Sequence, residues 1–423
     1  MTEQAARVTF RDVFAVAEFR ALWGAQLLSV IGDQLARVAL TILVFDRTRS
    51  AFLAAVTFVA SVVPVFVGGV TLSWLADRYP RRRVMIVCDL VRCGLVLIMA
   101  VHGVPLAVLV VLLFVVTLVG APFLSARAAV YPDVLAGDKY VMGTAVTLTT
   151  NQFAQVIGFS AGGAIAGFLG TNLALVVDAA TFAASALIVR SQVRYRPAAK
   201  AGAEPVGARA STGSDARLDG LIGAMRLVFG NPALRIPMLF GWLAAFYDAP
   251  EGVVTPLARS LGGGPVTVGF LLGAGALGVT LGAIGFSRFV APPSRLRWMG
   301  PLAISSCAIF IFFALQPRLW GALLILGTAG LFSAYQLAAN AAFVSATPHE
   351  RRGQAFGLAQ GGISLGQGAL MITAGAAADL ISPAAVISIC GATGTLAALS
   401  LAVRWSGSRT RGHERLESGI RSR

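Results

Sequence analysis

Long apolar blocks separated by short polar segments make up most of the chain. A helix needs about 20 apolar residues to cross a hydrocarbon layer about 30 Å thick, because each residue adds about 1.5 Å. Lipid offers no partner to unpaired backbone groups, so such blocks are expected to be helices. Twelve blocks qualify, at residues 20–45, 51–75, 83–102, 105–128, 143–169, 172–190, 234–258, 266–289, 298–316, 319–345, 354–380 and 383–404. The pattern predicts an all-α polytopic membrane protein with twelve transmembrane helices.

The longest break between blocks, residues 191–216, divides them into six and six. Just after it, residues 216–229 place apolar side chains on one helical face and charges on the other, which is typical of a helix in the membrane interface. A plain flexible linker is the alternative. The expected division is an N-terminal half (1–190), a cytoplasmic linker with the interfacial helix (191–230), a C-terminal half (231–404) and a basic cytoplasmic tail (405–423).

Two widely separated pairs of charged residues suggest that the halves are repeats. Arg20 is followed thirteen residues later by Asp33, and Arg235 is followed thirteen residues later by Asp248. Parallel halves related by an axis along the membrane normal, with a binding site between them, are one recurring transporter design. The pattern therefore favours two pseudo-symmetric six-helix halves.

Composition excludes a soluble protein, and the charge distribution predicts the topology. Apolar residues make up 57% of the chain and charged residues only 13%, far from the usual balance of a globular domain. The net charge of +15 comes mostly from arginines between the blocks, so it indicates cytoplasmic loops rather than a nucleic-acid surface. No cleavable secretory signal precedes the first block. Both termini are therefore expected in the cytoplasm, and the preference for Arg over Lys suggests a bacterial inner membrane.

Several motifs resemble a known transporter family. Residues 75–83 (LADRYPRRR) are similar to the signature loop of the major facilitator superfamily, with Ser73 and Pro80 where glycines are usual. The stretches at 19–51, 177–182 and 347–353 resemble the branch that contains siderophore and macrolide exporters. The resemblance implies the twelve-helix fold of that superfamily and secondary active transport.

A glycine-rich stretch at 158–167 resembles the antiporter motif of the same superfamily, although Phe159 replaces the usual proline. Glycines at four-residue spacing also let helices approach closely, so simple helix packing is the other interpretation.

Four of the charged residues within apolar blocks are the foremost functional candidates, because an ionisable group there costs about 2.5–3.5 kcal/mol on insertion scales. Asp33 and Arg37 share one helical face, which suits either proton exchange by Asp33 beside a substrate-binding Arg37 or a permanent structural ion pair. Asp248 and Glu251 are three residues apart around Pro250, so they are either a proton-coupling pair or two carboxylates at the wet outer mouth. Asp33, Asp248 and Glu251 are the candidate proton-coupling residues.

A second group of charges lies toward the cytoplasmic side. Resemblance to the signature loop implies that this group latches one of two conformational states; setting the topology alone is the other interpretation. Asp89 and Arg92 are expected close to the cytoplasmic end of the third block, and Asp178 is expected to stabilise helix packing. The candidate latch residues are Asp77, Arg78, Arg81, Arg82, Asp89, Arg92 and Arg127.

Neutral polar residues within the blocks suggest a substrate cavity between the halves. Amides cost less in lipid than charges do, and nearby aromatic residues suit an amphipathic, partly apolar substrate. Each such residue is also compatible with ordinary helix packing. The candidate cavity residues are Gln34, Arg37, Asn151, Gln152, Gln155, Tyr247, Gln336, Asn340 and Gln360.

No pattern typical of an enzyme is present. The chain lacks a phosphate-binding Gly-x-x-x-x-Gly-Lys-Ser/Thr loop, and its three histidines are scattered without metal-ligand spacing. We therefore expect no catalytic residue, no metal and no cofactor, with the proton gradient as the energy source. No feature demands more than a monomer.

Taken together, these patterns predict a proton-coupled antiporter that exports a small amphipathic compound, such as a drug, an antibiotic or a siderophore, by alternating access. An uptake symporter or a lipid-translocating protein of the same fold is the nearest alternative. A gated channel or a membrane receptor is the alternative of another class.

Overall fold

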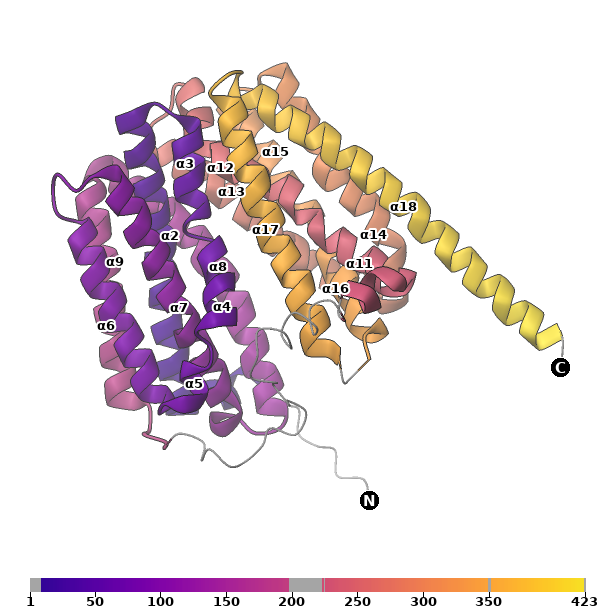
Figure 1. The fold of residues 1–423 in the computed structure, drawn as a ribbon, viewed down its shortest axis with the longest axis horizontal. Coiled ribbons are helices and arrows are strands. Elements are labelled where there is room, and N and C mark those ends of the chain that lie inside the picture. The colour runs from indigo at the N-terminus through magenta and orange to yellow at the C-terminus, as the bar shows by residue number, and fades with distance from the viewer. Residues whose placement is uncertain (1–8, 198–222, 224, 349–350, 422–423) are drawn as a thin grey trace. The chain divides into compact units, whose positions relative to one another are not determined.

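The computed structural model describes residues 9–197, 223, 225–348 and 351–421, with backbone only for residues 293 and 407–421 (Figure 1). The described residues are almost entirely helical and contain no strand, which confirms the all-α fold. The N-terminal helices are α1 (Phe10–Phe14), α2 (Ala17–Thr48), α3 (Ala51–Val59), α4 (Val63–Thr71), α5 (Leu75–Arg78), α6 (Arg81–Met99), α7 (Leu106–Val134), α8 (Asp138–Phe168) and α9 (Thr171–Gln192).

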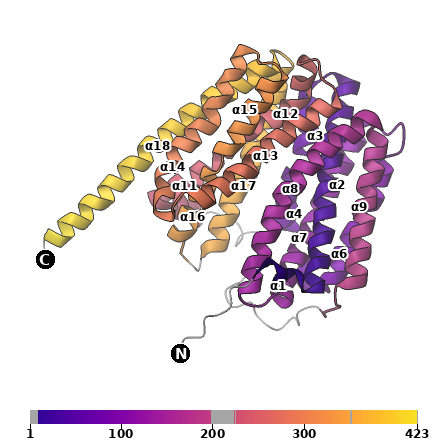
Figure 2. The ribbon, with the colours of Figure 1, turned by 180° about the vertical axis from the view of Figure 1, so that it is seen from behind.

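The remaining helices follow the linker, and the same elements are seen from behind in Figure 2. Residues 225–230 are helical, while most of the predicted interfacial helix lies outside the described residues. The C-terminal elements are α11 (Pro232–Trp242), α12 (Ala244–Ser260), α13 (Pro265–Phe289), α14 (Pro292–Ala308), the 3-10 helix η1 (Ile309–Leu315), α15 (Leu319–Phe332), α16 (Tyr335–Ala346), α17 (Arg352–Ala378) and α18 (Pro383–Arg421).

Among the described residues, eight helical segments are long and apolar enough to cross a membrane. The other expected spans correspond to α6, α8, the pair α11 and α12, and α17, so the count of twelve stays a prediction. The eight segments are Ala17–Thr48, Ala51–Thr71, Leu106–Val134, Thr171–Gln192, Pro265–Phe289, Ser294–Leu315, Leu319–Ala346 and Pro383–Ser406.

Prolines explain where the apolar segments are interrupted. The block at 51–75 is divided into α3 and α4, and Pro64 occupies the first turn of α4, where its missing N–H costs no helical hydrogen bond. The block at 234–258 is divided at Leu243 into α11 and α12, and α12 contains Pro250 and Pro256. Backbone groups freed by these prolines need protein or water as partners, because lipid cannot satisfy them.

The described chain forms two compact units. The first comprises Met1–Ala203 together with Ala258–Ala276, so the beginning of α13 packs with the N-terminal helices. In this unit α2 packs against α8 and α9, and α6 packs against α7 and α9. Its apolar core includes Phe19, Met85 and Phe123, each at most 2% exposed.

The second unit comprises Glu204–Leu257 and Leu277–Arg423. Here α11 packs against α16, and α14 packs against α16 and α18. Phe240, Met299 and Tyr335 are fully buried at the centre of its core. Val228, from the predicted interfacial helix, is also fully buried and belongs to a smaller apolar cluster of this unit.

Glycines allow the beginning of α13 to lie directly on α8 within the first unit. A Cβ added at Gly163 would lie 2.6 Å from the Pro265 carbonyl oxygen and 2.7 Å from the Gly269 Cα, so only a hydrogen fits between the two backbones. Without a strong hydrophobic drive between helices in lipid, such close backbone packing is a main source of helix association. The glycine-rich stretch predicted from the sequence therefore serves helix packing here; whether it also has an antiport-specific role stays a prediction.

The close approach makes Gly163 sensitive to a single added methyl group. Gly163→Ala is expected to lower the thermal unfolding midpoint, because separating α8 from α13 costs about 1–3 kcal/mol. Gly94→Ala is the matched control, since a Cβ at Gly94 meets no atom within 4 Å. That control should leave the midpoint unchanged or raise it, because Ala is the better helix former. Thermal unfolding of the purified protein in detergent measures both, and equal midpoints for the two variants would contradict the contact.

Candidate functional site

A half-buried ion pair joins α2 to α6 inside the first unit. The Arg92 Nη2 donates to the Asp33 Oδ1 at 2.5 Å, and Nη1 donates to the Ser29 hydroxyl at 3.2 Å. The guanidinium carbon lies 4.0 Å from the centre of the Phe182 ring, which comes from α9. The Arg92 side chain is 5% exposed while that of Asp33 is 37% exposed. The cation is therefore deep in the protein, and its carboxylate partner has access to solvent.

Asp89 adds a second carboxylate close to the same arginine. Its Oδ1 lies 3.9 Å from the Arg92 Nη1, and its Oδ2 accepts a hydrogen bond from the Ser185 hydroxyl at 2.5 Å. Asp89 is fully buried. Because α6 begins at Arg81, Asp89 and Arg92 lie about 12 Å and about 16 Å along the helix. Both residues are buried inside the first unit, and the expectation that they lie close to the cytoplasmic end of their helix stays a prediction.

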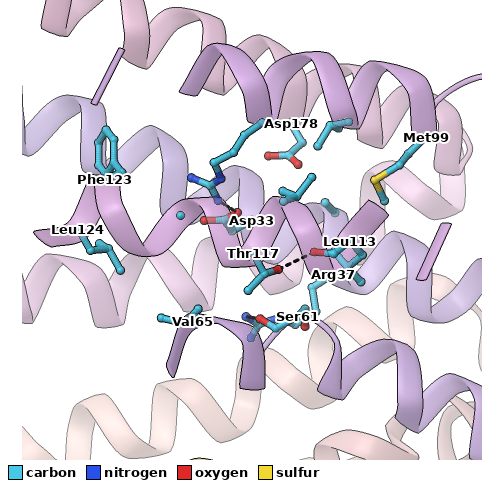
Figure 3. Close-up of a pocket in the computed structure, with 15 residues that line it drawn as sticks. Asp33, Arg37, Ser61, Val65, Met99, Leu113, Thr117, Phe123, Leu124 and Asp178 are labelled. Carbon is cyan, nitrogen blue, oxygen red and sulfur yellow. Dashed lines mark hydrogen bonds and ion pairs between the residues drawn. The ribbon is translucent and has the colours of Figure 1, made fainter. Parts of the chain in front are cut away.

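These charges border a cavity of about 90 Å³ within the first unit, which is large enough for several water molecules (Figure 3). Apolar side chains such as Met99, Leu113 and Phe123 form part of its wall. Figure 3 shows Asp33 and Asp178 near one another, with Thr117 beside them. The polar and charged side chains that line the cavity are Asp33, Arg37, Ser61, Arg92, Thr117 and Asp178.

Arg37 lies on the same cavity but has contacts of its own. Its Nη2 donates to the Ser61 carbonyl oxygen at 3.0 Å, and its guanidinium lies 5.3 Å from the centre of the Phe58 ring. The ion pair that the structure gives Asp33 is with Arg92 of another helix, a contact that spacing along α2 cannot reveal.

Asp178 is the cavity residue that the sequence undervalued. It is 1% exposed, and its Oδ1 has no hydrogen-bond partner. A Cβ at Gly32 would collide with that oxygen, so the glycine makes room for the carboxyl group against the α2 backbone. The available signal was an aspartate within an apolar block, the same signal that identified Asp33.

The second unit holds another carboxylate cluster, built on α12. The Asp248 Oδ2 accepts a hydrogen bond from the Gln367 amide of α17. Glu251 is one helical turn further along α12, on the same side as Asp248. Gln367 is not among the candidate cavity residues of the sequence analysis, yet it is the side chain that binds Asp248.

Aromatic side chains and an amide lie close to this carboxylate cluster. The Tyr247 and Tyr335 rings are 6.4 Å apart and nearly perpendicular. The Gln336 amide donates to the Gly241 carbonyl oxygen at 3.0 Å and to the Tyr335 hydroxyl at 3.3 Å. Two of the predicted cavity residues, Tyr247 and Gln336, are thus linked through Tyr335.

The other predicted cavity residues are distributed over both units. Gln34 is buried where α2 crosses α8, with its Cβ 2.8 Å from the position of a Cβ at Gly158. Gln155 donates to Gln152 at 2.9 Å on α8, which also carries Asn151. Asn340 is on α16 and Gln360 is on α17 of the second unit. Their grouping into one substrate cavity stays a prediction.

Two of the predicted latch residues hold the beginning of α6. Arg81 binds Asp133 at 2.9 Å and the Ala129 carbonyl oxygen at 2.8 Å, and Arg82 donates to the carbonyl oxygen of Arg190. These contacts tie the beginning of α6 to α7 and α9, well away from the Asp33–Arg92 pair.

Three further latch candidates lie on helices that contact α6. Asp77 and Arg78 are on the short helix α5, and the Arg127 guanidinium lies 5.4 Å from the centre of the Tyr131 ring. A latching role for the predicted group stays a prediction.

One ion pair of the first unit was not predicted from the sequence. The Arg259 Nη2 contacts both carboxylate oxygens of Asp46 at 2.7 Å, joining the last turns of α2 and α12. Arg259 also reaches the Gly263 carbonyl oxygen at 3.5 Å. Arg47 and Arg49 follow Asp46 closely and are cations that could pair with it locally. The sequence therefore does not indicate that the partner of Asp46 is Arg259, far along the chain.

Comparison with known proteins supports a single family. The family model of the Major Facilitator Superfamily matches residues 22–333 and 252–421. An uncharacterised MFS-type transporter of Bacillus subtilis (strain 168), YkuC, is 24% identical over 186 residues. That match covers 43% of this chain and 43% of the relative, so the chain spans less than half the length of that curated relative.

Solved structures show the same fold at low identity. The nucleoside transporter NupG is 16% identical with a TM-score of 0.68, over 91% of this chain and 99% of that structure. A bacterial homologue of the human lysosomal transporter Spinster is 16% identical with a TM-score of 0.64, over 94% and 96%. A POT family transporter in complex with 5-aminolevulinic acid is 10% identical with a TM-score of 0.72, over 91% and 95%.

The apolar helices, the fold of these structures and the extent of the family match agree. The chain belongs to the major facilitator superfamily and is a multi-pass membrane transporter of that type.

Proposed function

We propose that this transporter is a proton-coupled antiporter that exports a small amphipathic compound by alternating access. The observation that supports this proposal most directly is the Asp33–Arg92 ion pair. Its carboxylate is 37% exposed and borders a polar cavity, while its cation is 5% exposed. A carboxylate that exchanges a proton needs access to water, and the exposure of Asp33 on the cavity meets that need.

Protonation of Asp33 would change the charge of the cavity by one unit and break the ion pair. The proton comes from water in the cavity, and Asp33 becomes a neutral hydrogen-bonding group. A substrate that needs the ionised carboxylate then competes with the proton, which is the requirement for antiport. The membrane potential supplies about 2.3 kcal/mol per charge per 100 mV for such a cycle.

Asp248 and Glu251 provide a second candidate site for proton exchange in the second unit. The Gln367 amide donates a hydrogen bond to Asp248 and holds its carboxyl group in place. Glu251 lies one turn away, so the two carboxylates influence one another electrostatically. Between the two, Glu251 is our first choice for the proton-carrying residue.

The side chains near Asp248 suit an amphipathic substrate. Tyr247 and Tyr335 offer flat apolar faces with hydroxyl groups, and Gln336 offers an amide beside them. The resemblance to siderophore and macrolide exporters favours natural products or drugs as cargo. The solved neighbours carry different names, a nucleoside transporter, a Spinster homologue and POT family transporters, so uptake symport and lipid translocation are the alternatives to test.

The topology completes the proposal. Arginines concentrated on one side of the predicted spans place both termini in the cytoplasm of a bacterium, with the helices in its inner membrane. The protein acts as a monomer, with no cofactor and the proton gradient as its energy source.

Neutralising Asp33 is expected to abolish export driven by a proton gradient. The transporter is produced in an efflux-deficient bacterial host, and a panel of amphipathic antibiotics and dyes identifies a compound to which it raises tolerance. With that compound, Asp33→Asn should reduce export at least about tenfold while the amount of protein in the membrane stays the same. Asp138→Asn, at the exposed start of α8, is the matched control and should transport normally. Normal proton-driven export by Asp33→Asn would refute the assignment.

Replacing Glu251 should leave the exchange of substrate across the membrane intact but remove the coupling of transport to the proton gradient. In Glu251→Gln the substrate still binds, so exchange of labelled for unlabelled compound across proteoliposomes continues, while accumulation under an imposed pH gradient is lost. Equal loss of both activities would show that Glu251 binds substrate or supports the fold instead.

The same vesicles test the alternatives. An antiporter moves the compound against the flow of protons, whereas a symporter moves it with that flow. A fluorescent phospholipid reports lipid translocation, and a channel would show no acceleration of uptake by unlabelled compound on the opposite side.

A further inference from the structure

We propose that Asp178 is the reserve counter-ion of Arg92, the carboxylate to which the guanidinium transfers when Asp33 is neutralised. The exchange takes place inside the first unit, on the cavity shown in Figure 3. Its part in transport rests on the proton coupling proposed above, but the ion-pair exchange itself can be tested without any substrate.

The argument begins with the burial of Arg92. Its side chain is 5% exposed, and an arginine keeps its positive charge in proteins. A buried cation without a nearby anion is strongly destabilising, because water no longer solvates it. When Asp33 is neutralised, Arg92 keeps Asp89 at 3.9 Å but loses its short ion pair, and another carboxylate within reach would replace that pair.

Asp178 is placed to be that anion. Phe182, which packs 4.0 Å from the Arg92 guanidinium, is four residues after Asp178 on α9, so both side chains belong to one face of that helix. The Asp178 Oδ1 lies close to Gly32, the residue that precedes Asp33 on α2. The Asp178 carboxyl group is therefore beside the α2 backbone, one residue from Asp33. The guanidinium thus already lies against the helical face that carries Asp178.

The cavity distinguishes Asp178 from Asp89, the other buried carboxyl group near Arg92. Among the described residues, each of these two acids has an Oδ1 without a hydrogen bond. Asp178 lines the cavity together with Arg92, whereas Asp89 is not one of the cavity-lining residues and its Oδ2 accepts the Ser185 hydroxyl. The Asp178 Oδ1 is therefore the unbonded carboxylate oxygen that belongs to the cavity wall.

Few other ionisable groups of the described residues surround Asp178. Asp33 and Arg37 of α2 and Arg92 of α6 line the same cavity as Asp178. Asp89 and the thiol of Cys93, both also on α6, are the other ionisable groups nearby. The Arg37 guanidinium is held by Ser61 on another part of the wall.

The exchange takes up one proton and one positive charge. A hydronium ion in the cavity transfers its proton to Asp33 and becomes water, an O–H bond forms on Asp33, and the Asp33–Arg92 ion pair breaks. The guanidinium then turns on the Phe182 ring toward Asp178, so the cation keeps an anion throughout. Loss of the proton from Asp33 reverses the movement. Asp178 thereby converts protonation of an exposed carboxylate into movement of a buried side chain.

A double-mutant cycle tests the inference on the full-length protein in lipid nanodiscs. Asp33→Asn and Asp178→Asn are each expected to lower the thermal midpoint slightly, because the remaining aspartate still pairs with Arg92. The double variant should lose at least about 3 °C more than the sum of the single losses. An additive cycle would overturn the proposal.

Two matched cycles serve as controls. Asp33→Asn combined with Asp89→Asn measures the rival carboxyl group, and a larger coupling there than with Asp178 would assign the reserve role to Asp89 and refute the proposal. Asp33→Asn combined with Asp138→Asn, at the exposed start of α8 in the same unit, should be additive.

A triple variant keeps the test decisive if the double variant fails to fold. Adding Arg92→Met removes the cation that lacks a partner, and apolar replacements of buried ionic groups are often neutral or stabilising. The triple variant should therefore regain the expression and thermal midpoint that the double variant loses. Failure to recover would mean that the two aspartates matter for reasons unrelated to Arg92.

The stability cycle and the transport assays can fail independently. Strong coupling between Asp33 and Asp178 without proton-driven transport would support the ion-pair exchange and refute the proposed antiport. Proton-driven transport with an additive cycle would support the antiport and refute the exchange.

Discussion

A permanent positive charge inside an apolar helical unit needs a negative partner at all times, and the first unit is organised around that requirement. Arg92 receives a carboxylate from α2, a second carboxylate from its own helix and an aromatic ring from α9. Because α9 packs against both α2 and α6, one set of helices holds all three groups in place. The packing of the unit and the electrostatics of its cavity therefore depend on one another, and a change in either alters both.

The need of Arg92 for a negative partner also connects the first unit with the proposed transport. An ion pair with one exposed member is a weak point in an otherwise apolar structure, because water can reach it and change its charge. The second unit contains a different arrangement, in which an amide rather than a cation holds the half-buried carboxylate. The two aspartates that the sequence spacing relates, Asp33 and Asp248, thus have different chemistry around them.

The apolar blocks were sufficient to predict the all-helical fold, because lipid leaves the backbone few alternatives. Asp33 and Asp248 could be recognised for the same reason, since charges within such blocks are costly. Their partners Arg92 and Gln367 could not be assigned, because pairing between helices depends on how each helix is rotated in the bundle. The Asp46–Arg259 pair was invisible for a similar reason: both residues follow spans, where charges are ordinary.

The contact between Gly32 and Asp178 restricts how the sequence can change. A side chain at position 32 would occupy the space of the Asp178 carboxyl group, and a larger acid at position 178 would collide with the α2 backbone. A substitution at either position is therefore tolerated only after a compensating one at the other. Relatives that keep an acid at position 178 should keep glycine at position 32, so these two positions, far apart in the chain, evolve as one unit.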